Sequence, residues 1–157
     1  MVNPYASQLG KLDPLEVIAT TPAKLRALVD AICGERIEQP RAPGKWNARE
    51  IVCHLADCEV AFAFRLRQTL AEERHEMQPF DQEAWAKKYA AYSVEAALAT
   101  FSALRQWNLA LVRSLGAADL AKPVNHPERG DMTLRTIVET MGGHDRNHLQ
   151  QVEEIAG

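Results

Sequence analysis

Hydrophobic residues recur at three- and four-residue intervals along most of the chain, which is the pattern of amphipathic helices. The clearest stripe comprises Ile51, Leu55, Cys58, Phe62, Leu66 and Leu70. A second stripe carries apolar side chains from Leu98 to Leu115. No segment alternates between apolar and polar residues as a half-buried strand does. The pattern therefore predicts an all-α protein with four main helices.

The first main helix is expected to begin at Asp13 and Pro14. An aspartate oxygen can accept a hydrogen bond from a free N–H of the first turn, and proline presets the helical φ. The helix is expected to run to about Cys33 and to end at Gly34. Pro22 predicts a kink or a short break inside it.

The other three helices begin with capping signals. Asn47 and Glu50 have the spacing of a capping box, in which each side chain accepts a backbone N–H of the other residue. Ser93 and Thr133 are the expected caps of the third and fourth helices. The expected limits of these last two helices are residues 93–116 and 133–155.

The connector between the second and third helices, from Arg74 to Tyr92, is unusually long. Antiparallel neighbours in a bundle are usually joined by about 2–8 residues. The connector contains one short helical piece around Trp85. Its length predicts a crossover that lets the second and third helices run parallel.

Composition and charge are those of an ordinary globular protein. Of the 157 residues, 46% are hydrophobic and 25% are charged, so one domain spanning residues 1–157 is expected. The formal net charge is -3, with acidic and basic residues interleaved. This argues against nucleic acid as a partner, because such binding needs clustered Lys and Arg. The chain has no long apolar stretch and no leader pattern, which predicts a cytoplasmic protein without membrane contact. The three cysteines are interpreted as reduced thiols.

Three histidines predict a metal site. His144 and His148 stand four residues apart within the expected fourth helix, a spacing at which two imidazoles can converge on one ion. His54 lies inside the second helix among apolar residues, where an imidazole needs a partner. A four-helix bundle can bring these two helices face to face and leave a position on the ion for an outside molecule. Chance spacing of the pair and an ordinary core role for His54 are the simpler alternatives.

The neighbours of these histidines leave further alternatives open. Cys58 follows His54 by four residues, so a closed cage of three imidazoles and one thiolate is an alternative to its role as a small core residue. Asp57, three residues after His54, is the candidate catalytic residue, placed to orient an imidazole or a bound ligand. His75 and His126 lie in connectors and are expected at the surface, with His126 the nearer to a pocket mouth.

At these residues the chain resembles the DinB-like family, which includes the YfiT-type thiol transferases and is related to mycothiol-dependent maleylpyruvate isomerases. The resemblance covers nearly the whole chain. It rests on the segments PGKWNAREIVCHLAD, HPERGDMTL and GGHDRNHLQQ. Trp46 and the His54-x-x-Asp57 pair match the family's signature in the second helix, and the last segment matches its terminal H-x-x-x-H. Cys58 is a departure, because an ordinary apolar residue is expected there.

The resemblance implies an up-down-down-up four-helix bundle with the long crossover between helices two and three. It also implies a divalent transition metal on His54, His144 and His148. Nickel or zinc is expected first, while iron, manganese and copper also suit imidazole ligands. Family members commonly dimerise, so a homodimer is expected.

The activity implied by the resemblance is a detoxifying S-transfer, in which a low-molecular-weight thiol attacks a small electrophile. Asp57 would orient a ligand, and the candidate pocket residues are Trp85, Arg65, Gln151 and His126. A metal-dependent hydrolase is one alternative, since the ion could activate water instead. The other alternative is a non-catalytic helical module that binds a metal or a small ligand in a stress response.

Overall fold

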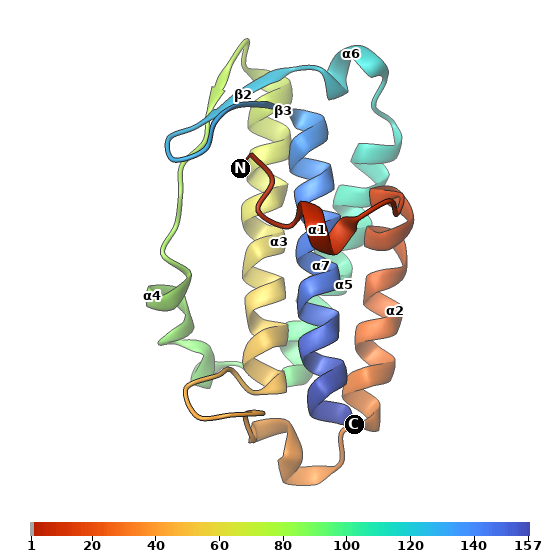
Figure 1. The fold of residues 1–157 in the computed structure, drawn as a ribbon, viewed down its shortest axis with the longest axis vertical. Helices are drawn as coiled ribbons and strands as arrows, with labels where there is room; N and C mark the ends of the chain where they lie inside the picture. The colour runs from red at the N-terminus through yellow and green to blue at the C-terminus, as the bar shows by residue number, and fades with distance from the viewer. Residues whose placement is uncertain (1) are drawn as a thin grey trace.

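Four long helices lie side by side in the computed structural model, which describes residues 2–157 (Figure 1). They are α2 (Pro14–Ala31), α3 (Ala48–Ala71), α5 (Val94–Arg113) and α7 (Leu134–Ala156). The shorter elements are α1 (Ala6–Leu9), η1 (Gly34–Glu38), β1 (His75–Glu76), α4 (Gln82–Ala86), η2 (Tyr89–Ala91), α6 (Ala117–Leu120), β2 (Pro123–His126) and β3 (Gly130–Thr133). No helix within residues 2–157 is long and apolar enough to cross a membrane.

The four helices run in the expected directions. In Figure 1, α2 and α7 run toward the end of the bundle that holds the C-terminus, whereas α3 and α5 run away from it. The segment between α3 and α5 returns along the outside of the bundle and contains α4 and η2, so α3 and α5 are parallel. The up-down-down-up bundle with its crossover is confirmed, and α4 is the short helical piece expected there.

Capping bonds confirm three of the four predicted helix starts. Asp13 Oδ1 and Ser93 Oγ each accept a backbone N–H of the first turn, at 2.9 and 3.1 Å. Asn47 and Glu50 form the full capping box, with both reciprocal hydrogen bonds at 2.9 Å. Thr133 precedes α7 as expected, but its side chain makes no capping bond.

Of the kink or short break expected at Pro22, the break is absent, because α2 continues through that residue. Proline has no N–H to donate to the carbonyl four residues earlier, which here belongs to Ile18. The Ile18 oxygen instead accepts a hydrogen bond from Arg105 of α5 at 3.0 Å. A side chain from another helix therefore satisfies the carbonyl that the proline leaves free. The helix ends at Ala31, three residues before Gly34.

A three-stranded sheet covers the end of the bundle where α3 ends and α7 begins (Figure 1). Strand β2 pairs in parallel with β1 and antiparallel with β3. The expectation of no strands is wrong for this segment, because strands of two to four residues are too short to show an alternating pattern. His126 pairs with Gly130, whose φ of 79° lies in the left-handed region that closes a three-residue hairpin loop.

A buried ion network crosses the core. Arg105 of α5 is 1% exposed, and Glu59 of α3 and Asp145 of α7 are 0% exposed. The Arg105 guanidinium donates to Glu59 Oε2 at 2.8 Å and to both carboxylate oxygens of Asp145. The network therefore fixes the register between α3 and α7, the two helices that carry the three histidines.

Candidate metal centre

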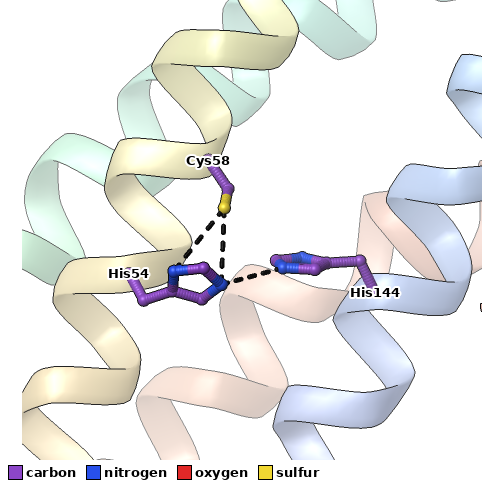
Figure 2. Close-up of side chains that lie close together, drawn as sticks. All are labelled: His54, Cys58 and His144. Atoms are coloured by element: carbon purple, nitrogen blue, oxygen red, sulfur yellow. Dashed lines mark hydrogen bonds between the residues drawn. The ribbon is translucent and has the colours of Figure 1, made fainter. Parts of the chain in front are cut away.

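His54 of α3 and His144 of α7 face each other inside the bundle (Figure 2). Their Nε2 atoms lie 3.0 Å apart. Both rings are buried, with 1% and 4% of the residue exposed. Ligands about 2.0–2.1 Å from a tetrahedral zinc ion stand about 3.3 Å apart. The separation of the two nitrogens is thus close to that of two ligands of one ion.

His148 stands one turn after His144 and completes the group of imidazoles. Its ring centroid lies 4.7 Å from that of His54 and 4.4 Å from that of His144. The Nδ1 atom of His148 lies 2.9 Å from Gln151 Oε1. Because an amide oxygen only accepts, this contact places the proton on Nδ1 and leaves the Nε2 lone pair free for a ligand. The structure brings the three predicted histidines together.

Cys58 also lies in this cluster. Its Sγ atom is 3.4 Å from His54 Nε2, as the dashed lines in Figure 2 show. Donor atoms of His54, Cys58 and His144 all lie within 4.8 Å of one another, and His148 lies outside this tightest group. The closed cage of imidazoles and thiolate therefore remains an alternative in this geometry.

Lowered pKa values keep the imidazoles of the centre neutral. Burial and the neighbouring His148 lower the pKa of His54 to about 3, and burial lowers the pKa of His148 to about 4. Burial also lowers the pKa of His144, with the other two histidines adding to the shift. The His144 Nδ1 atom is buried without a hydrogen-bond partner within residues 2–157. Three neutral imidazoles packed against one another are a fitting donor set for a divalent transition metal.

Aromatic side chains enclose the imidazoles. The ring of Trp46, which precedes α3, lies 4.7 Å from that of His54. Tyr5 and Phe62 approach His144 edge-on, with centroids 5.2 and 6.0 Å away. These apolar walls limit the access of water and account for the lowered histidine pKa values.

Asp57 lies away from this centre. It lines a separate hollow between α3 and α5, together with Cys53 and Tyr92. Within residues 2–157 its carboxylate makes no hydrogen bond to any of the three histidines, and burial raises its pKa. The expected shared face with His54 is not found.

Two hollows flank the centre and contain three of the four candidate pocket residues. Gln151 and His148 line a hollow of about 320 Å³. Arg65 and His126 line another of about 170 Å³, together with His144 and Cys58. Tyr5 and Gln82 line both hollows, so the two adjoin.

Trp85 lines neither hollow. Its ring stacks on Phe80, with centroids 4.6 Å apart. Phe80 in turn lies under Arg65, whose guanidinium carbon is 5.4 Å from the centroid of the Phe80 ring. Trp85 therefore supports the wall of the smaller hollow rather than forming it.

The surface placement expected for His75 and His126 is wrong, because each is 4% exposed. His75 lies in β1 and His126 in β2, where no strand was expected. His126 Nδ1 accepts the backbone N–H of Glu128 at 3.1 Å. His75 Nδ1 lies 2.9 Å from Glu72 Oε2.

Tyr5 and Arg129 line the hollows, but sequence reasoning missed both. The signal for Tyr5 is the Gly142-Gly143 pair just before His144. A side chain at Gly143 would lie 2.7 Å from Tyr5 Cβ, so the N-terminal segment packs directly on the α7 backbone. A glycine pair inside a helix marks such a close approach.

Known proteins resemble this chain in sequence and in fold. The DinB superfamily model matches residues 18–152. A protein of Oceanobacillus iheyensis, OB0782, is 26% identical over 140 residues, covering 88% of this chain and 81% of its own length. YfiT of Bacillus subtilis is 26% identical over 145 residues, covering 90% and 82%. Both are named as proposed metal-dependent hydrolases.

The solved structure of Bacillus subtilis YfiT has the same architecture. It superimposes with a TM-score of 0.84 at 26% identity, covering 90% of this chain and 83% of YfiT. That structure is described as having an unusual four-helix bundle topology, which agrees with the parallel α3 and α5 found here. The family model, the relatives and the bundle around the histidine cluster agree, and the chain belongs to the DinB superfamily.

Proposed function

We propose that this protein is a metal-dependent enzyme that transfers a low-molecular-weight thiol to a small electrophile. The observation that carries the proposal is the convergence of two buried Nε2 atoms, 3.0 Å apart, with a third imidazole packed against both rings. Three nitrogen ligands leave a position open on a tetrahedral ion, as catalytic rather than structural sites do.

The two hollows support a reaction with two substrates. One lies beside His148 and the other beside His144, and both share the side chains of Tyr5 and Gln82. A thiol in one hollow and an electrophile in the other would meet at the histidine cluster. Holding two reactants in one geometry is itself a large part of catalysis.

The chain's own residues provide the ligands and their orientation. His54, His144 and His148 would hold the ion, nickel or zinc in the first place. When bound, the ion lowers the pKa of a coordinated thiol or water and so supplies a nucleophile at neutral pH. Gln151 fixes the tautomer of His148, while Trp46 and Phe62 exclude water from the imidazoles.

A metal-dependent hydrolase is the second candidate, and the names of the relatives favour it. The same centre would then activate water in place of a thiol. The transferase consumes a thiol and the hydrolase consumes water, so an assay with and without added thiol separates the two candidates.

Elemental analysis of protein purified without an affinity tag or chelator is the first test. We expect about one divalent transition metal ion per chain, lost in His54→Ala and His144→Ala. His75→Ala is the matched control, because His75 is an equally buried histidine in the sheet. Full metal content in His148→Ala would remove that residue from the ligand set. Metal-free wild-type protein whose thermal stability does not change with added zinc or nickel would refute the proposal.

Activity is tested next with the metal-loaded protein. Consumption of monochlorobimane that depends on an added thiol supports the transferase, and hydrolysis of simple esters without a thiol supports the hydrolase. Metal binding with neither activity would identify a non-catalytic binding module.

Cys58→Ala tests the closed cage. The proposal expects this variant to keep its metal, and it expects the same of the matched control Cys53→Ala, which changes another buried free cysteine of α3. Loss of the metal from Cys58→Ala alone would mean that the sulfur fills the open position. The proposed chemistry would then fail.

A further inference from the structure

We propose that the hollow beside His144 and Cys58 binds the oxyanion of a small acidic molecule, a carboxylate or a phosphate, between Arg65 and Arg129. This proposal deepens the proposed function and rests on it, because the hollow opens on the histidine cluster. It identifies the substrate class as small molecules that carry a carboxylate or a phosphate.

Arg65 is held in place at the wall of this hollow. It extends from α3, donates to the backbone oxygen of Gln78 at 3.1 Å, and lies over the ring of Phe80. Both partners belong to the crossover segment between α3 and α5. These contacts use one face and one N–H of the guanidinium. Arginine has five N–H donors in a planar fork, so donors remain for a planar anion.

Arg129 comes from the hairpin loop between β2 and β3. The loop is built by local bonds, since the Arg129 backbone N–H donates to the His126 oxygen at 3.1 Å. His126 Nδ1 accepts the backbone N–H of Glu128, also at 3.1 Å, and Gly130 supplies the positive φ that closes the turn. The loop therefore carries the second guanidinium to the rim of the same hollow.

The positive charge of the hollow is not neutralised by ion pairs. Among residues 2–157, neither Arg65 nor Arg129 has a carboxylate within salt-bridge distance. Among the residues that line this hollow, Glu128 is the single acidic one. Burial lowers the pKa of Arg65, and repulsion by the nearby Arg129 adds to this shift while Cys58 opposes it. A bound anion would relieve this repulsion.

The size of the hollow limits the ligand. Its volume is about 170 Å³, below the range of about 300–1,000 Å³ typical of drug-sized ligands. An acid of a few carbon atoms is a better fit. With its oxyanion on the arginines, the rest of the molecule would point to the histidine cluster.

The test measures binding of succinate, inorganic phosphate and neutral succinamide to the zinc-loaded protein by calorimetry. We expect succinate, phosphate or both to bind at least tenfold more tightly than succinamide. Binding should weaken as salt is added. Which of the two anions binds better identifies the group that the hollow prefers. Equal binding of succinate and succinamide, or no anion binding, would overturn the proposal.

Variants assign the binding to the two arginines. Arg65→Gln with Arg129→Gln should weaken anion binding tenfold or more, whereas Arg113→Gln with Arg135→Gln removes the same charge elsewhere and should not. Unchanged binding in the first double variant would refute the site. Arg129→Gln alone changes only an exposed loop residue, so it provides the same comparison if the double variant is unstable.

Metal content, measured for every variant, separates this proposal from the proposed function. Arginine-dependent anion binding in protein that holds no metal would leave the anion site standing without the enzyme. Metal loading and turnover without anion binding would leave the enzyme standing without the anion site.

Discussion

Gln151 is the side chain that orients His148, and its removal should weaken metal binding. The amide oxygen of Gln151 lies 2.9 Å from His148 Nδ1 and fixes the proton on that nitrogen. Loss of such a partner typically costs about 10–100-fold in metal affinity. We expect a loss of about tenfold in zinc affinity for Gln151→Ala, measured by competition with a chromophoric chelator. Gln150→Ala is the control, because that side chain is exposed and bonds only to Glu154. Equal affinities in both variants would exclude the orienting role.

Arg105 bonds to groups on α2, α3 and α7, so removal of its charge should lower the free energy of unfolding strongly. Arg105→Met would leave Glu59 and Asp145 buried without a counter-charge. Breaking a buried ion pair in this way costs about 3–5 kcal/mol. We expect that loss in the free energy of unfolding by urea. Arg26→Met is the comparison, because its ion pairs are exposed and should cost about 1 kcal/mol or less.

The positions of single residues were predictable only in part. The four-residue spacing of His144 and His148 fixes their shared face whatever surrounds the helix. The case of His54 is different, because Cys58 is turned about 40° to one side of it and Asp57 about 60° to the other. Neighbouring helices decide which of the two meets the centre. The structure gives that place to Cys58, and Asp57 faces α5.

Packing of the N-terminal segment on α7 depends on one missing side chain. A Cβ at Gly143 would collide with the backbone carbonyl of Tyr5. Glycine to alanine inside a helix ordinarily stabilises it by about 1 kcal/mol. For Gly143→Ala we expect the opposite sign, a loss of about 1–3 kcal/mol from overpacking. Faster proteolysis of the first ten residues should accompany the loss.

Arg146→Ala is the control for this variant, because Arg146 is an exposed position on the same helix. Its effect on stability and on proteolysis should be small. If Gly143→Ala were as stable as the wild type, the N-terminal segment would not pack as closely as the structure indicates.

The long helices could be predicted from the sequence, whereas the short strands could not. The starts of α2, α3 and α5 depend on capping bonds between residues two or three apart, so local sequence suffices. The sheet depends on pairing of His75 with Val124, far apart in the chain. Strands this short carry no periodicity of their own, and with the sheet unforeseen, the burial of His75 and His126 was also missed.

At the scale of the molecule, the crossover between α3 and α5 does more than make these two helices parallel. It makes α3 antiparallel to α7, and both helices present histidines to the same point (Figures 1 and 2). On its way back it also supplies Phe80 and Gln82 to the hollows. The hairpin loop and the N-terminal segment add Arg129 and Tyr5. The helices thus provide the metal ligands, and the connections between them provide the substrate walls.

The whole metal-free protein should lose stability as the pH falls below about 6.5. Unfolded histidines bind protons there, whereas folded His54 and His148 stay neutral down to pH values of about 3 and 4 because burial lowers their pKa. The unfolded state therefore binds more protons in this window, and stability rises with pH up to about 6.5 and then levels off. With His144 also neutral, the three histidines together should cost up to about 4 kcal/mol between pH 8 and 5.5. Urea unfolding at a series of pH values measures this. His148→Gln should make the slope shallower by the share of one histidine, and a variant with the wild-type slope would show that folded His148 takes up protons as readily as the unfolded residue does.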